Sequence, residues 1–362
     1  CILAVPGENM RRIGSCGLVA LAWLAAGLTA AAQGGAPGLH EPGAHEGVVF
    51  SSYPPLARNS EILARVFTPL TLAGIKREFA RTGKTLGETS FDLAAEKFLV
   101  YVPPVKPPQG YSLMVFVPPW QKAQLPKGWG PVLDQFGMIL VTPARSGNDE
   151  DIVSRREPLA LIAAQNVMAQ YPIDPARVFV GGMSGGSRMA LRLALAYPDL
   201  FHGALLNSGS DVIGTIYEPL PAAPLFRQFQ TGTRLLYVTG DQDAANVETE
   251  TRSKRSMQDW CVSDVASMRM PFTGHEVAPP AILTRALQAL LQPERPDPDR
   301  MASCRTAIDA EVAAGLGKTD ALIANGKRAD AQKMVKDIDA KFGGLAAPHS
   351  LELDTILTRI QP

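Results

Sequence analysis

The sequence predicts an α/β fold in which a mostly parallel sheet is flanked by helices. Short apolar runs that end at Gly or Pro alternate with longer runs of helical spacing, and this alternation is typical of βαβ units. The apolar runs are hydrophobic at nearly every position, which indicates strands buried on both faces. In such a sheet the functional residues gather at the carboxyl ends of the strands.

The predicted strands and helices follow one another from residue 96 onward. The expected helices of this region are separated by buried strands, and the helix over Glu157–Tyr171 has its apolar residues broadly on one face, so we expect it to be amphipathic. The predicted helices cover Trp129–Phe136, Glu157–Tyr171 and Ser187–Tyr197, and the strands cover Glu96–Val102, Tyr111–Val117, Met138–Thr142, Val178–Val180, Gly203–Ser208, Leu235–Thr239 and Met268–Phe272.

The N-terminal segment has the composition of a targeting sequence. A short basic start at Met10–Arg12 precedes the apolar run Leu18–Ala32, which ends in small residues. This pattern predicts a secretory signal peptide over residues 1–32, with residues 1–9 as an over-long start. The apolar run is short for a membrane anchor. We therefore expect a secreted or periplasmic protein with no stable membrane span after cleavage.

Composition divides the rest of the chain into three parts. Residues 33–58 are rich in Gly, Pro, Ala and His and predict a flexible leader. The α/β domain is expected over 59–292, and a C-terminal helical extension over 293–362 begins with a linker at Pro293–Pro298. With 46% hydrophobic residues, 19% charged residues and a net charge of +0, nothing favours nucleic acid as a partner.

Two cysteines, Cys261 and Cys304, would remain after cleavage. In an exported protein such a pair indicates a disulfide, which would staple the C-terminal region to the main domain. Two unrelated buried thiols are the alternative, and the sequence leaves both open.

A serine in a glycine-rich turn is the strongest functional signal. Val178–Val180 runs into Gly182-Met183-Ser184-Gly185-Gly186, which fits the G-x-S-x-G pattern between a predicted strand and a predicted helix. A serine on such a sharp turn exposes its hydroxyl above the sheet. Side chains at Gly182 and Gly186 would clash with the neighbouring strand and helix. A glycine-rich turn without chemistry is the alternative interpretation.

A nucleophilic serine needs a base and an orienting carboxylate. His275 is the expected base because it follows a predicted strand late in the chain. Asp243 is the preferred acid, since it lies three residues after Gly240, which ends the strand region Leu235–Thr239. Asp241 and Asp211 remain alternatives; Asp241 is also suited to bonding backbone amides of its turn.

The oxyanion hole requires two backbone N–H groups aimed at the developing negative charge. One is expected from Gly185, directly after the serine. The other is expected from the loop after Val117, where Pro118 and Pro119 have no N–H to give. Trp120 is therefore the first residue of that loop that can donate.

Ser184, Asp243 and His275, in this order and after strands, resemble the α/β-hydrolase superfamily. The stretch Tyr171–Gly186 is more narrowly similar to secreted esterases of the polyhydroxybutyrate depolymerase and feruloyl esterase type. The resemblance spans roughly residues 96–291. It implies an α/β-hydrolase fold, Ser184 as nucleophile, His275 as general base, Asp243 as its orienting acid, and no cofactor or metal.

The chain departs from that family at two places beside the expected oxyanion hole. The family usually carries a His-Gly pair after the third strand, where this chain has Pro118-Pro119. It often carries Asn or Ala directly after the nucleophile, where this chain has Gly185.

These features together predict an exported serine esterase that acts on a small-molecule or polymeric ester. Two alternatives stay open. One is a catalytically idle hydrolase fold that serves as a binding or adaptor module, with the helical extension as its docking element. The other is a serine peptidase of related fold, which would need a propeller or cap domain with a charged pocket that the sequence does not display. The oligomeric state is not predicted.

Overall fold

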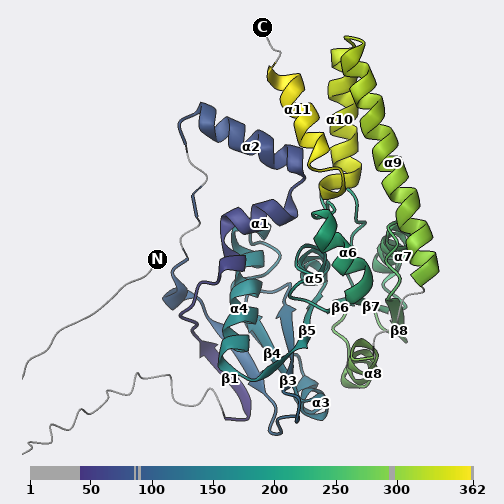
Figure 1. Ribbon diagram of the computed structural model, residues 1–362. Coiled ribbons are helices and arrows are strands. Elements are labelled where there is room, and N and C mark those ends of the chain that lie inside the picture. The colour runs from purple at the N-terminus through teal and green to yellow at the C-terminus, as the bar shows by residue number, and fades with distance from the viewer. Residues whose placement is uncertain (1–40, 85–86, 89–90, 293–297, 360–362) are drawn as a thin grey trace, which may run out of the picture. The chain divides into compact units, whose positions relative to one another are not determined.

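An eight-stranded sheet forms the centre of the molecule in the computed structural model, which describes residues 41–84, 87–88, 91–292 and 298–359 (Figure 1). The strand order is β1-β2-β4-β3-β5-β6-β7-β8. The strands from β4 to β8 in this order pair in parallel, whereas β1 and β2 are antiparallel to their neighbours. The predicted signal peptide and residues 293–297 of the predicted linker lie outside the described residues.

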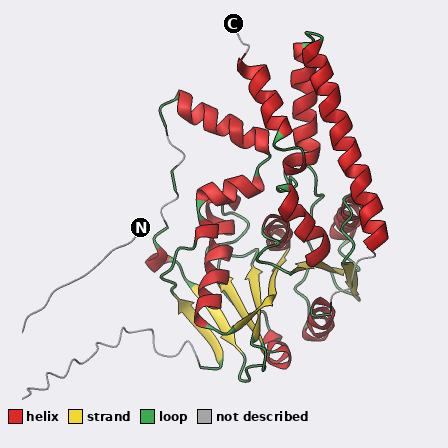
Figure 2. Cartoon of the chain, in the orientation of Figure 1, coloured by secondary structure: helices red, strands yellow, loops and turns green. Residues whose placement is uncertain are grey.

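All seven predicted strands occur and one further strand precedes them; most ends shift by a few residues, but the strand predicted over Val178–Val180 is longer and covers Ile173–Met183. Helices cover both faces of the sheet (Figure 2). The strands are β1 (Gly43–Val48), β2 (Phe98–Val102), β3 (Tyr111–Val117), β4 (Met138–Pro143), β5 (Ile173–Met183), β6 (Gly203–Asn207), β7 (Arg234–Gly240) and β8 (Val265–Met270). The helices are α1 (Asn59–Val66), α2 (Pro69–Arg81), α3 (Trp129–Phe136), α4 (Glu157–Gln170), α5 (Gly185–Ala196), α6 (Ala223–Gly232), α7 (Ala244–Asp259), α8 (Pro280–Leu290), α9 (Pro298–Ala324), α10 (Arg328–Phe342) and α11 (His349–Arg359).

The prediction of a flexible leader over residues 33–58 is wrong from Gly43 onward, where strand β1 begins. Strand β1 pairs with β2 there, with Gly43 opposite Val102 and Val48 opposite Phe98. The strand lies at the sheet edge and buries little besides Val48, so its composition carries no hydrophobic alternation. The folded domain therefore begins before the predicted boundary at residue 59.

Each face of the sheet has its own hydrophobic cluster, because side chains alternate along a strand. On β3, Leu113, Val115 and Val117 belong to the cluster that includes residues of α4 and α5. Met114 and Phe116 belong to the opposite cluster, with residues of α3 and α8. All five side chains are buried. The sheet is thus covered on both faces, which confirms the predicted fold class.

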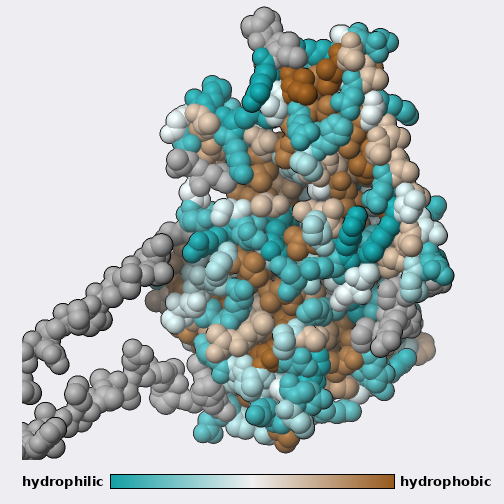
Figure 3. Space-filling view, in the orientation of Figure 1, coloured by the Kyte–Doolittle hydropathy of each residue, from teal (hydrophilic) through white to brown (hydrophobic). Residues whose placement is uncertain are grey.

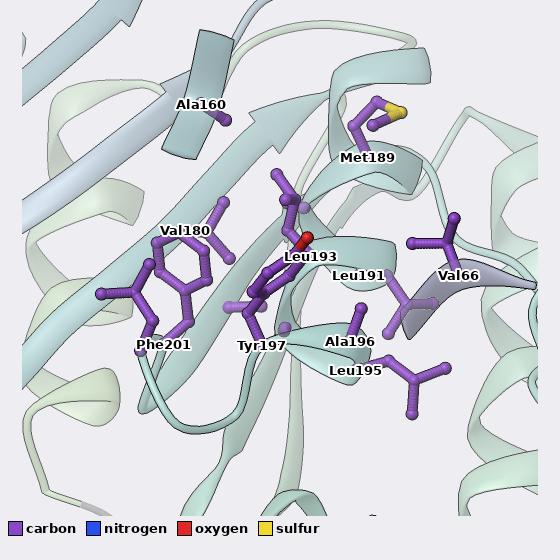
Figure 4. Packing of buried hydrophobic residues seen from close by; sticks show 14 of the residues in the cluster. Val66, Ala160, Val180, Met189, Leu191, Leu193, Leu195, Ala196, Tyr197 and Phe201 are labelled. Atoms are coloured by element: carbon purple, nitrogen blue, oxygen red, sulfur yellow. The ribbon is translucent and has the colours of Figure 1, made fainter. Parts of the chain in front are cut away.

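Two helices support the turn that carries Ser184. Below it, Val180 of β5 and Leu193 of α5 pack around Tyr197, whose ring is fully buried (Figure 4). Helix α4 differs from the amphipathic helix predicted, because its residues from Glu157 to Ala164 are all buried. The short helix Pro55–Ala57 packs against α4, so α4 is covered on the side away from the sheet as well.

The described part of the C-terminal extension contains the helices α9, α10 and α11. A disulfide, an aromatic contact and a hydrogen bond join them to the main domain. Cys261, just after α7, forms a disulfide with Cys304 of α9. The rings of Trp260 and Phe342 meet edge to face at 5.9 Å. Asp354 of α11 accepts a hydrogen bond from Arg77 of α2 at 2.6 Å. Apolar residues gather among these helices on the face shown in Figure 3. Within the described residues, no helix has the length and hydrophobicity needed to cross a membrane.

We expect that replacing both cysteines, Cys261→Ala with Cys304→Ala, lowers the free energy of unfolding. The disulfide joins residues 43 apart in sequence, and the loop-closure model assigns about 4 kcal/mol to a loop of that length. Urea denaturation of the two proteins measures the difference. Dithiothreitol should lower the urea midpoint of the wild type and leave the double variant unchanged; an insensitive wild type would contradict the expectation.

Candidate active site

Ser184 occupies a strained position between β5 and α5. Its backbone has φ 57° and ψ −123°, a region that non-glycine residues rarely adopt. The two flanking glycines permit this turn. A Cβ on Gly182 would lie 2.2 Å from the carbonyl oxygen of Gly186, and a Cβ on Gly186 would lie 2.0 Å from that of Val117. Both obstacles are backbone atoms, so no rotamer change could relieve the clash.

Asp243 and His275 meet beside this turn, from the ends of neighbouring strands β7 and β8. The Nδ1–H of His275 donates to Oδ2 of Asp243 at 2.7 Å. This bond fixes the tautomer and leaves Nε2 of a neutral imidazole as an acceptor. Asn246 of α7 also donates to both carboxylate oxygens of Asp243, at 3.0 and 2.9 Å. The carboxylate is therefore held from two sides.

The two rival carboxylates have other partners. Asp241 accepts a hydrogen bond from the backbone N–H of Thr273, in the loop after β8, at 3.3 Å, and not from an amide of its own turn as the sequence suggested. Asp211 pairs with Arg188 at 2.5 Å. Among the described residues, Asp243 is the candidate carboxylate that contacts His275.

Asn207, at the end of β6, connects the serine turn to the histidine loop. Its carbonyl oxygen accepts from the N–H of Ser184 at 2.8 Å. Its side-chain amide donates to the carbonyl of Glu276 at 3.1 Å and accepts from the N–H of Ala278 at 2.7 Å. The residue is fully buried. Asn207 thus connects Ser184, through its backbone carbonyl, with the segment directly after His275, through its side-chain amide.

The hydroxyl of Ser184 has no hydrogen-bond partner within the part of the chain that the structure describes. Such bonds are commonly long or misaligned in ligand-free sites and tighten when substrate binds. In this structure, Ser184 is therefore related to Asp243 and His275 by position alone, because all three follow the carboxyl ends of strands in the same sheet.

The loop after β3 is fixed by hydrogen bonds from the segment after β4. The N–H of Asn148 donates to the carbonyl of Pro119 at 3.1 Å, and that of Arg145 to Gln121 at 2.6 Å. No described residue accepts a hydrogen bond from the backbone N–H of Trp120 or of Gly185. The N–H of Gly185, the first residue of α5, is one of the helix N-terminal N–H groups that have no partner within the helix, and the positive end of the helix dipole lies there.

The side chain of Asn148 packs directly against Gly185. A Cβ on Gly185 would lie 2.2 Å from Oδ1 of Asn148. Asn148 is exposed, so its carboxamide lies at the rim of the site. The side-chain amide of Asn148, from the loop after β4, therefore occupies the space that a side chain at position 185 would need.

Two cavities flank the serine turn. One, of about 730 Å³, is lined by Trp120, Met183 and His275. The other, of about 580 Å³, is lined by Arg188 of α5 and by the apolar side chains of Ile216 and Tyr217. No group of three or more His, Cys, Asp or Glu side chains that could hold a metal ion occurs in the described ranges.

A serine turn after β5, an acid after β7 and a histidine after β8, on a sheet of this strand order, define the α/β-hydrolase fold. No family model matches the sequence. Over 95 residues the chain is 32% identical to a poly(3-hydroxybutyrate) depolymerase of Ralstonia pickettii, covering 22% of this chain and 20% of that protein. It is 33% identical to poly(3-hydroxyalkanoate) depolymerase C of Paucimonas lemoignei, covering 23% of each. The match thus spans about a fifth of the length of these relatives.

Solved esterase structures are also similar, at low sequence identity. A ferulic acid esterase has a TM-score of 0.40 and 15% identity, over 56% of this chain and 93% of its own. A thermostable esterase has a TM-score of 0.41 and 16% identity, over 55% and 59%. Acetyl xylan esterase from Aspergillus awamori has a TM-score of 0.37 and 14% identity, over 51% and 90%. The assignment of the fold rests on the strand order rather than on these likenesses.

We expect Asn207→Ala to lower the free energy of unfolding by about 1–3 kcal/mol, since buried groups lose their partners, and to lower by more than tenfold the kcat of the ester hydrolysis that is proposed below for this site. Steady-state kinetics and urea denaturation measure the two effects. Asn166→Ala is the matched control, because Asn166 is equally buried and bonds to Ser52 and Ile162 away from the site. A similar fall in kcat in both variants would show that Asn207 acts only through stability.

Proposed function

We propose that the protein is an exported serine hydrolase that cleaves carboxylic esters through an acyl-enzyme on Ser184. The observation that carries this proposal is the bond between Asp243 and His275 at 2.7 Å, at the same sheet edge as a serine held in a strained turn. Each element has a defined task in acyl transfer. The N-terminal sequence supports export, since it has the pattern of a signal peptide.

In the proposed reaction, His275 Nε2 accepts the hydroxyl proton of Ser184 as the oxygen attacks the ester carbonyl. Asp243 holds the imidazole in the required tautomer and stabilises its charged form. The N–H groups of Gly185 and Trp120 bind the tetrahedral oxyanion. Collapse of this intermediate releases the alcohol, which takes the proton from His275. Water activated by His275 then hydrolyses the acyl-enzyme and regenerates Ser184.

The chemical class of the ester follows from the relatives only as a proposal. Both curated relatives are named as depolymerases of polyhydroxyalkanoates, which are polyesters of hydroxy acids. We therefore propose aliphatic esters as substrates, either polymeric or as short oligomers. The exposed side chains of Ile216 and Tyr217, which line a cavity together with Arg188 of α5, suit an aliphatic chain.

We expect a fluorophosphonate probe to label the mature protein at Ser184 and to leave Ser184→Ala unlabelled. An activated serine attacks phosphorus as it attacks a carbonyl, because the same base removes its proton. In-gel fluorescence and peptide mass spectrometry identify the labelled residue. Ser187→Ala serves as a control, since Ser187 is buried and bonded to the carbonyl of Gly209. Folded wild type that takes up no label would refute the proposed function.

We also expect Asp243→Asn to reduce kcat by roughly 10³- to 10⁴-fold, because an amide at this position favours the wrong imidazole tautomer. Asp241→Asn, two residues away, removes a charge from the same turn without touching His275, and should retain kcat within about threefold, in the range of a surface change. Ester kinetics with both variants provide the comparison. Equal losses in the two variants would contradict the role of Asp243.

A further inference from the structure

A small cavity of about 200 Å³ lies beside Gly185 and is rich in cationic side chains. Its lining includes Arg156, Arg188 and Arg192, together with Asn148 and the two carboxylates of Asp211 and Glu218. His275 is not part of it. A cavity with three guanidinium groups next to a nucleophile is suited to an anion, provided that one of the three is not already neutralised.

Arg156 is that group. Its side chain belongs to a residue only 4% exposed, and it donates to the backbone carbonyls of Ser146 at 3.0 Å and Pro118 at 3.2 Å. No carboxylate among the described residues forms an ion pair with it; the acidic residue that supports its charge, Glu150, is paired with Arg155. Burial lowers the pKa of Arg156 to about 10, so it stays positive at neutral pH. A buried cation without a counter-ion is costly.

The other charges of the cavity are already paired. Arg188 bonds to Asp211 at 2.5 Å. Arg192 bonds to Glu157 at 2.5 Å and to Glu218 at 3.0 Å. Burial raises the pKa of Glu218 to about 7, although the charge of Arg192 acts in the opposite direction. Within the described residues none of these carboxylates forms an ion pair with Arg156.

The position of His275 indicates which part of a substrate would reach Arg156. The imidazole must protonate the leaving alcohol, and it lines the opposite cavity with Trp120 and Met183. The alcohol therefore belongs in that cavity. The acyl chain then extends past Gly185 toward Arg156, and the small volume suits a short chain.

We propose that the cavity at Arg156 binds a carboxylate at the far end of a short acyl group, so that the enzyme prefers half-esters of dicarboxylic acids. Arg188 lines the same cavity. Its guanidinium, which is paired with Asp211, is a second hydrogen-bond donor for the bound carboxylate. This inference rests on the proposed ester hydrolysis at Ser184 and adds a substrate class to it.

The test compares monoethyl succinate with ethyl 4-methylpentanoate, in which an isopropyl group replaces the carboxylate at nearly the same shape. Ethanol release gives kcat/KM for each ester. We expect the wild type to favour the acid by roughly tenfold to hundredfold, the range of a hydrogen bond to a charged group. Arg156→Gln should bring this ratio close to one, and Arg156→Lys should retain part of it. Arg155→Gln is the matched control, because Arg155 bonds to Glu96 and does not line the cavity.

The outcomes separate this inference from the function on which it rests. Turnover of the neutral ester without preference for the acid in the wild type overturns the carboxylate site and leaves the esterase intact. An Arg156→Gln variant that slows both esters equally also overturns it, because the charge would then act on every ester. If Arg156→Gln does not fold, competitive inhibition of the wild type by succinamate, with 4-methylpentanamide as the neutral comparison in which isopropyl replaces the carboxylate, decides the same question. Failure of both esters and of the fluorophosphonate label would instead refute the esterase.

Discussion

The site depends on how closely the backbone of each loop approaches the next. A Cβ on Gly209 would lie 2.2 Å from the carbonyl oxygen of Ser184, and one on Gly240 would lie 2.2 Å from that of Gly274. Gly182 and Gly186 are confined in the same way. Since the obstacles are backbone atoms, any side chain at these positions would force the two backbone segments apart, and only glycine allows them to lie so close. Strain at Ser184 is tolerated because these packed loops leave the turn no other conformation.

The sequence predicted most of the sheet, because strands buried on both faces are apolar throughout and end at Gly or Pro. It missed β1 for the opposite reason: an edge strand buries little besides Val48 and has no hydrophobic pattern to find. Periodicity also misjudged α4, since burial on its outer side depends on Pro55–Ala57, which lies a hundred residues earlier in the chain. Such a contact leaves no mark on the spacing of residues within the helix.

For the site, the sequence singled out residues whose chemistry and place after a strand are both visible. Asp243 and His275 are such residues, and the structure brings them into contact. Asn207 and Asn246 were missed, although each follows a strand or opens a helix near a candidate residue, because asparagine is common in turns and nothing local distinguishes a positioning role. The sequence could not predict that Arg156 lacks an ion pair within the described residues, because this depends on where carboxylates of distant segments lie in the fold.

Helix α7 joins two features that lie far apart in the chain. Asp243 is its N-cap residue, and Cys261, bonded to Cys304 of α9, follows its C-cap residue. Helix α7 has 16 residues, a length of about 24 Å, and separates the disulfide from Asp243 by that distance. The extension is thereby connected, through one disulfide and one helix, to the carboxylate that is bonded to His275, although none of its own side chains reaches that carboxylate within the described residues.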